Sequence, residues 1–149
     1  MSNYNDVVKV LTEKFGGDNF ISLTTTDGER VFTRVVNACY DDGAFYIVTY
    51  ALSNKMKQIE KNPVVAIFCG EWFGAYINAH GVGENLGHVL AEENTVMMAK
   101  LREAFSMWYT GGHVNENDPN TCLLRIRLTD ALLSVDFEQQ KINFVNKMA

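Results

Sequence analysis

The sequence predicts a mainly β protein, an antiparallel barrel with helices at its periphery, and three observations support this fold class. We count about seven or eight segments rich in β-branched and aromatic residues, and about three helical segments. Short turns join consecutive strands, for example Asp27-Gly28 and Asp41-Asp42-Gly43. Strands and helices do not alternate as they do in βαβ units, so an antiparallel barrel is favoured over a parallel sheet.

Length and composition indicate a single domain, residues 1–149. Hydrophobic residues make up 47% of the 149 residues, which is enough for a substantial core. No apolar run approaches the ~18 residues of a membrane helix, and the N-terminus lacks a basic segment followed by an apolar block. We therefore expect a cytoplasmic protein with no membrane partner. The net charge of −5 also argues against a nucleic-acid partner, because that requires a basic surface.

The cysteines and histidines give no indication of a metal site or of disulfides. Cys39, Cys69 and Cys122 are odd in number, form no CxxC pair and lie in apolar segments, so we expect buried, reduced thiols. The three histidines, at positions 80, 88 and 113, lack metal-binding spacings such as HExxH. No metal is expected.

In the first half of the chain, the spacing of apolar residues predicts a helix over residues 4–15, ended by Gly16-Gly17. Strands are expected over 20–26, 30–39 and 44–50, where they would form an antiparallel meander. A short helix over 53–61 would have Ser53 as its N-cap and would end at Asn62-Pro63. A strand over 64–69 follows.

In the second half, a long strand is expected over 71–84, with bends at its glycines. A broad apolar stripe predicts the longest helix, over 88–109, followed by a polar loop over 113–120. Strands over 121–128 and 131–137 would be separated by a tight turn at Thr129-Asp130. One further short run covers 142–145.

Hydroxyl and ammonium groups gather where the third strand ends and the short helix begins. Thr49, Ser53 and Lys55 lie there, and Arg34 on the preceding strand could face the same pocket. Free N–H groups at a helix N-terminus would add to an anion site. Ordinary surface charges explain these residues about as well, so spacing alone leaves both interpretations open.

Other catalytic patterns are missing from the sequence. It contains no GxSxG, no GxxxxGK[ST] and no GxGxxG after a strand, which argues against a serine hydrolase, a P-loop enzyme and a Rossmann fold. The carboxylate pairs Asp41-Asp42 and Glu92-Glu93 are typical of solvated surface groups.

The order of several short segments resembles that of a known family. These segments are Arg34-Val35-Val36, Phe45-Tyr46-Ile47-Val48-Thr49, Ser53-Asn54-Lys55, Gln58-Ile59 and Asn62-Pro63. From about Val7 to Phe137 the chain resembles the pyridoxamine 5′-phosphate oxidase-like, FMN-binding split β-barrel superfamily. The true oxidase has Arg where Asn54 stands, and it ends in an Arg-rich motif that this chain lacks. The resemblance is therefore to the general-stress and uncharacterised flavoprotein branches.

The resemblance implies FMN as cofactor, held at a homodimer interface. The residues that it places at the flavin are Arg34, Val35, Val36, Val48, Thr49, Ser53, Asn54 and Lys55. Ser53, Asn54 and Lys55 would form the phosphate turn. Trp108 and Trp72 are candidates to reach the ring, although core packing explains each of them as well.

The function implied is that of a flavin-dependent oxidoreductase acting on a small molecule that the sequence does not identify. The alternative is a non-catalytic module of the same fold that binds flavin, heme or deazaflavin. No catalytic acid or base can be named from the sequence.

Overall fold

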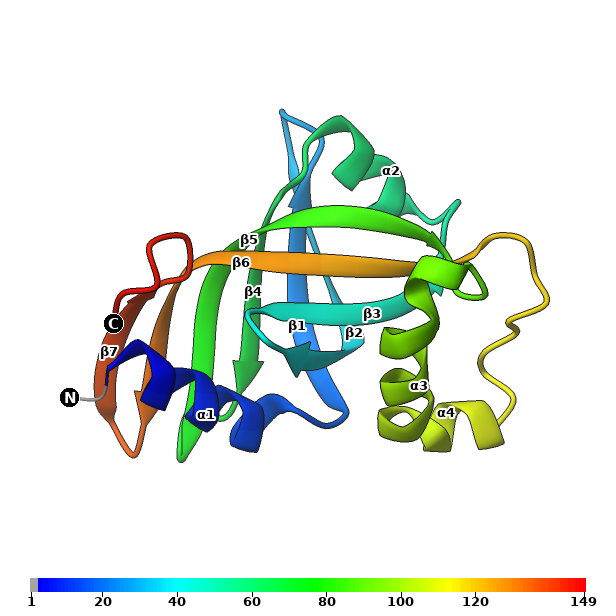
Figure 1. Cartoon of the computed structure of the whole chain (residues 1–149). Helices are drawn as coiled ribbons and strands as arrows, with labels where there is room; N and C mark the ends of the chain where they lie inside the picture. Colours follow the sequence, from blue (N-terminus) through cyan, green and yellow to red (C-terminus); the bar gives the residue numbers. More distant parts are fainter. Residues whose placement is uncertain (1–2) are drawn as a thin grey trace.

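A computed structural model describes residues 3–149 and contains one antiparallel sheet of seven strands in the order β3-β2-β1-β4-β5-β6-β7. β3 also pairs with β6, so the first six strands in this order close into a barrel (Figure 1). β7 stays outside the barrel and pairs with the second half of β6. The predicted antiparallel barrel with peripheral helices is confirmed.

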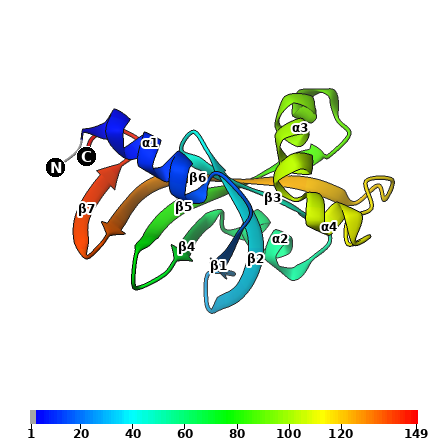
Figure 2. The same ribbon diagram turned by 90° about the horizontal axis from the view of Figure 1, so that it is seen from below.

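The strands are β1 Asn19–Thr26, β2 Val31–Asp41, β3 Ala44–Tyr50, β4 Val64–Gly70, β5 Ala75–His88, β6 Thr121–Val135 and β7 Glu138–Asn143. The helices are α1 Tyr4–Phe15, α2 Asn54–Lys61, α3 Thr95–Ala104 and α4 Ser106–Thr110, with a 3-10 turn at Glu92–Asn94. α1 and α2 lie on opposite sides of the barrel, while α3 and α4 lie together beside the part of the wall where β5 ends and β6 begins (Figure 2).

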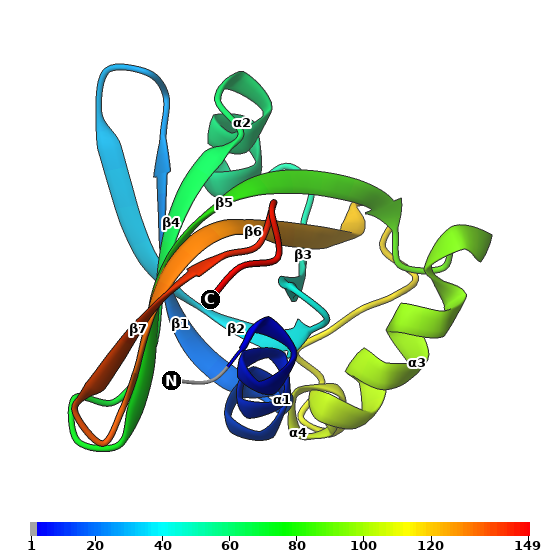
Figure 3. The same ribbon diagram turned by 60° about the vertical axis from the view of Figure 1, so that its left-hand side comes forward.

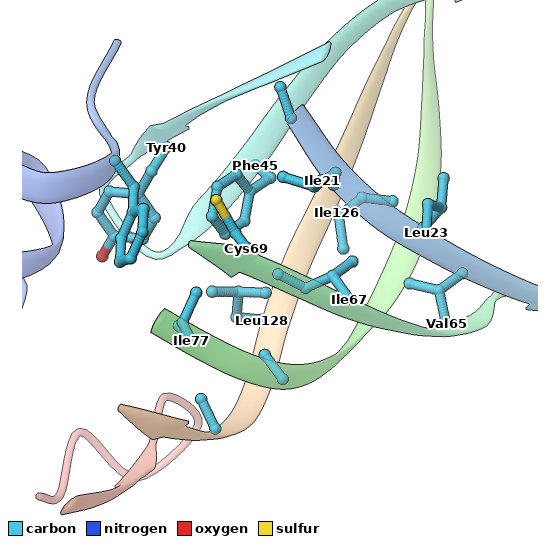
Figure 4. Packing of buried hydrophobic residues seen from close by; sticks show 14 of the residues in the cluster. Ile21, Leu23, Tyr40, Phe45, Val65, Ile67, Cys69, Ile77, Ile126 and Leu128 are labelled. Atoms are coloured by element: carbon cyan, nitrogen blue, oxygen red, sulfur yellow. The ribbon is translucent and has the colours of Figure 1, made fainter. Parts of the chain in front are cut away.

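The barrel core follows from the period of two along each strand. In β1, Ile21 and Leu23 are fully buried, whereas Phe20, directly before Ile21, is 65% exposed. The inward side chains of the other strands meet those of β1 in one cluster (Figure 4). Burial of this apolar surface is the main favourable term in folding, at about 25 cal/mol per Å².

The two helices at the barrel contribute one face each to the same core. In α1 the buried residues Val7, Leu11 and Phe15 recur at helical spacing, and the Asn3 side chain caps the helix by accepting from the Asp6 N–H at 2.9 Å. In α2 the buried residues are Met56 and Ile59. Both predicted helices are thereby confirmed.

The predicted helix over 88–109 is wrong at its start and in its continuity. Strand β5 continues to His88, which pairs with Cys122 of the neighbouring strand β6, so this segment is extended and the helix begins only at Thr95. The Asn94 side chain donates to the Leu86 and His88 carbonyls and holds the chain in that turn. At Phe105 the backbone departs from helical geometry, which separates α3 from α4.

The predicted turn at Thr129-Asp130 is also wrong. β6 runs unbroken through these residues, and the register against β5 shifts between the pairs Gly81–Leu128 and His80–Asp130, which leaves Thr129 as a bulge. The bulge lies where β6 stops pairing with β3 and starts pairing with β7. The strand expected from residue 71 starts at Ala75, because residues 71–74 form the turn between β4 and β5.

The three cysteines are free and buried, as expected. Among residues 3–149, no helix is long and apolar enough to cross a membrane.

Candidate functional site

The barrel is split between β2 and β3. β2 pairs with β1 from Val31 to Ala38, but it pairs with β3 only through its last three residues. β3 instead pairs with β6 along its whole length. Within the described chain, one edge of β2 therefore has no strand partner over residues 31–38, and the β1–β2 hairpin extends away from β3 (Figure 3). The backbone N–H and C=O groups of this edge can pair with a ligand. Val35 and Val36 lie on it.

Arg34 lies on the same segment, and its side chain is half-buried between β1 and α2. One guanidinium nitrogen donates to the Thr25 hydroxyl at 2.8 Å and to the Leu23 carbonyl at 3.2 Å. The other donates to Gln58 Oε1 at 2.8 Å, and the Thr25 hydroxyl donates to the same oxygen at 2.5 Å. Burial lowers the pKa of Arg34. Its charge is thus held in a fixed position beside the start of the split.

The N-terminus of α2 has the free donors of an anion site. Ser53 is the N-cap, as predicted, but its hydroxyl makes no capping hydrogen bond. The first bond of the helix runs from the Lys57 N–H to the Ser53 carbonyl at 3.1 Å, so the N–H groups of residues 54–56 have no acceptor within the helix. The first turn contains no acidic residue. No acidic side chain in the first turn of α2 therefore offsets the positive end of the helix dipole.

Lys55 is a second cation, at the N-terminus of α2. Its side chain is half-buried, and its ammonium donates to the Ser53 hydroxyl at 3.4 Å. Burial lowers the pKa of Lys55, and the positive charge of Arg34 lowers it further. Among residues 3–149, neither Lys55 nor Arg34 forms an ion pair with a carboxylate. Two partly desolvated cations without an acidic partner are typical of a site that receives an anion.

Val48, Thr49 and Trp108 border a different part of the surface. A hollow of about 260 Å³ is lined by Val48 and Thr49, and a second hollow of about 230 Å³ is lined by Val48 and Trp108. The Trp108 indole N–H donates to Asp18 at 2.7 Å, and its ring packs edge-to-face on Phe20. Neither hollow is lined by Lys55 or Arg34.

The structure therefore divides the predicted residues into groups. Ser53 and Lys55 lie at the start of α2, with Asn54 exposed at the first helical position. Arg34 is bonded to Gln58 one turn further along the helix, and its charge lowers the pKa of Lys55. Trp72 lies elsewhere, in the turn after β4, where it stacks on Tyr76 at 6.0 Å between ring centroids. It lines neither hollow beside β3.

Two residues beside the predicted ones were not singled out as site residues from the sequence. Gln58 accepts from both Arg34 and Thr25, and its place three residues after Lys55 puts both on one face of α2. His113 lines both hollows, and its only indication in the sequence is its position directly after Gly111-Gly112.

Comparison with protein families gives one match that spans most of the chain. The sequence profile described as Pyridoxamine 5′-phosphate oxidase matches residues 9–134. This range contains the split, α2 and both hollows. No curated protein sequence matches the chain significantly.

Several solved structures are similar to the fold. The general stress protein 26 of Bacillus anthracis str. Sterne is 19% identical, with a TM-score of 0.68 over 91% of this chain and 98% of that one. A NimC/NimA family protein of Clostridium acetobutylicum is 20% identical, with a TM-score of 0.67 over 91% of each chain. HutZ, the heme storage protein of Vibrio cholerae, is 15% identical, with a TM-score of 0.65 over 90% and 95%. At these identities the similarity establishes the fold.

Proposed function

The chain belongs to the pyridoxamine 5′-phosphate oxidase family, and we propose that it is a flavoprotein that binds FMN and acts as an oxidoreductase on a small molecule. The observation that carries the proposal is the meeting of Lys55, Arg34 and the open first turn of α2 beside the unpaired edge of β2. A cofactor with a phosphate at one end and a polar ring at the other matches this combination of donors.

The phosphate end would be held by charge and by hydrogen bonds. The Lys55 ammonium, the Ser53 hydroxyl and the N–H groups of residues 54–56 are the donors available at the helix start. Arg34 adds positive charge and is fixed by Gln58. Because charge-assisted hydrogen bonds are about twice as strong as neutral ones, this end would supply much of the affinity.

The ring end would lie along the split. The backbone of Val35 and Val36 would pair with the polar edge of the ring, and Val48 and Thr49 would bound it on the β3 side. The flavin supplies the electron transfer, and the protein supplies binding and orientation. We also propose that the active form is a cytoplasmic homodimer with the flavin between the subunits. The outward side chains Phe20, Val35 and Phe68 are apolar and exposed on neighbouring strands, which supports an interface there.

A titration of the purified chain with FMN and with riboflavin tests the binding proposal. Flavin fluorescence should show saturable FMN binding and clearly weaker riboflavin binding, because riboflavin lacks the phosphate. Absence of FMN binding would overturn the function, and equal affinity for both flavins would remove α2 from the site. Oxidation of NAD(P)H by the FMN-loaded protein then distinguishes an oxidoreductase from a carrier, and light scattering gives the subunit number.

The similarity to a heme storage protein favours one alternative, a binding module of the same fold without turnover. In that case hemin should bind with a Soret shift and should compete with FMN. FMN binding that hemin leaves unchanged would reject this alternative.

A further inference from the structure

A cleft beside β3 shares Val48 and Thr49 with the ring end of the cofactor proposal, but its other walls have no role in that proposal. It consists of the two hollows of about 260 and 230 Å³, which share Val48, His113 and Val114 in their walls. Each hollow alone is smaller than the ~300–1,000 Å³ of typical small-molecule sites, and the shared wall residues place the two side by side. We name this pair of hollows the His113 cleft.

One end of the His113 cleft has flat, apolar walls. Phe105 and Trp108 come from the helical segment, and Val48 and Val114 come from β3 and the following loop. The Trp108 and His113 rings meet edge-to-face with their centroids 5.5 Å apart. Walls of this kind accept a planar ring, because aromatic side chains bury a large area at fixed geometry.

The polar groups of the cleft favour an uncharged ligand. Among the described residues that line it, none is Lys or Arg, and one is the acidic residue Asp118, whose Oδ1 accepts from the Asn120 N–H at 2.8 Å. An anionic ligand would therefore find no counter-charge and one like charge. Asn37, at the end of the open segment of β2, also lines the cleft and brings it to the split.

His113 supplies the specific donor. His113 is exposed, its ring makes no hydrogen bond to any of residues 3–149, and only its backbone N–H is bonded, to the Trp108 carbonyl at 2.9 Å. A Cβ built on Gly111 would lie 2.9 Å from a ring carbon of His113, so the imidazole rests directly against the glycine backbone. A neutral imidazole carries one N–H donor and one acceptor, and both remain available to a ligand.

The loop that carries His113 is held in place from several sides. Arg102 donates two hydrogen bonds from Nε and one from Nη2 to the Glu116 carboxylate at 3.0–3.2 Å, and the Tyr109 hydroxyl donates to it at 2.6 Å. The His88 ring contacts the Asp118 carbonyl at 2.8 Å. A wall fixed in this way loses little conformational freedom when a ligand binds.

We propose that the His113 cleft binds a flat, uncharged ring compound with an oxygen acceptor, which packs against Trp108 and accepts a hydrogen bond from His113. This assignment rests on the proposed function, because the cleft opens at the split where the flavin ring would lie. It names the class of substrate that would bind beside the flavin. Phosphorylated compounds are excluded from this class by the absence of cations among the lining residues described above.

Equilibrium dialysis with coumarin, an uncharged ring lactone, and coumarin-3-carboxylate, its anionic relative, tests the proposal on the full chain with and without FMN. Coumarin should bind saturably and the carboxylate at least about tenfold more weakly. His113→Phe keeps a flat ring but removes the donor, so it should weaken coumarin about three- to tenfold. Val114→Trp fills the shared wall and should abolish binding.

His80→Phe is the matched control, because His80 is an exposed histidine outside the cleft, and it should leave coumarin binding unchanged. Thermal melting confirms that each variant is folded. No saturable coumarin binding, or equal binding by the wild type, His113→Phe and Val114→Trp, would overturn the assignment. Coumarin binding measured without FMN tests the cleft even if the chain binds no flavin. FMN affinity, measured separately, tests the proposed function.

Discussion

Arg34 on the open strand β2 donates a 2.8 Å hydrogen bond to Gln58 on α2, and this bond joins the two parts of the proposed phosphate site. Gln58 Oε1 also accepts from Thr25, which is 1% exposed. One amide oxygen thus fixes a cation and satisfies a buried hydroxyl. The position of the cation relative to the helix start depends on it.

Replacing Gln58 should affect both stability and cofactor binding. Gln58→Ala leaves the Thr25 hydroxyl and the Arg34 guanidinium without this acceptor, so the free energy of unfolding in urea should fall by about 1–3 kcal/mol. FMN affinity should fall as well. Gln58→Glu keeps an acceptor for Arg34 but adds a negative charge beside the phosphate, so it should weaken FMN while largely retaining stability. Unchanged FMN affinity in both variants would place the phosphate elsewhere.

Lys55 should be the main side-chain contact of the phosphate. Lys55→Ala should weaken FMN binding by about 1–3 kcal/mol in a fluorescence titration, because it removes a charge-assisted hydrogen bond. Lys57→Ala is the matched control, since Lys57 is exposed on the same helix. Equal losses in the two variants would indicate a general charge effect, and would argue against a direct contact by Lys55.

The lowered pKa of Lys55 predicts a pH dependence of stability without ligand. Burial and the charge of Arg34 disfavour the ammonium in the folded state. Between the folded pKa and the unfolded value of 10.5, the unfolded chain binds more protons, so this residue makes the folded state more stable as pH rises. Lys55→Met should be the more stable protein below that window, and its advantage should shrink as pH rises through it.

Urea unfolding of the wild type and of Lys55→Met from pH 7 to 11 measures this difference. Lys57→Met, compared in the same way, should show no such trend. An advantage of Lys55→Met that stays constant over the whole range would contradict the proposed desolvation of Lys55.

The packing of α2 against the barrel depends on Gly83. A Cβ at Gly83 would lie 2.8 Å from Ile59 Cγ2, and the Gly83 N–H donates to the Pro63 carbonyl at 2.8 Å. Gly83→Ala should therefore push α2 outward and destabilise the protein by about 1–3 kcal/mol, with a loss of FMN affinity.

A double-mutant cycle isolates this contact. In an Ile59→Ala background, Gly83→Ala should cost clearly less stability than in the wild type, because the opposing methyl groups are gone. Strictly additive effects in urea unfolding would show that the cost arises elsewhere, for example from strand propensity.

Local parts of the fold could be predicted because their causes are local. The turn at Asp42-Gly43 has both residues at positive φ, +42° and +84°, a conformation that this pair adopts readily. The helix over 4–15 and the short helix ended by Asn62-Pro63 follow from apolar spacing and from the restriction that proline imposes. These elements required no knowledge of their neighbours.

The errors in the predicted elements arise where a segment distant in the sequence determines the local structure. The predicted helix started at His88, but the pairing of His88 with Cys122 keeps it in a strand. Thr129 looked like a turn residue, but β5 and β7 on either side hold it in a bulge. Sequence spacing records which side chains are apolar and says little about which strand will lie beside them.

The sequence by itself determined the barrel class, the short helix and the group of Arg34, Ser53 and Lys55 as a candidate anion site. Only the tertiary structure decided that β2 and β3 separate, that Gln58 fixes Arg34, and that Trp108 borders a cleft with His113 away from Lys55. The physical reason is that a strand's free edge and a cleft's walls are relations between segments far apart in the chain. Such relations are set when the barrel closes, whereas turns and helix ends are set by neighbouring residues.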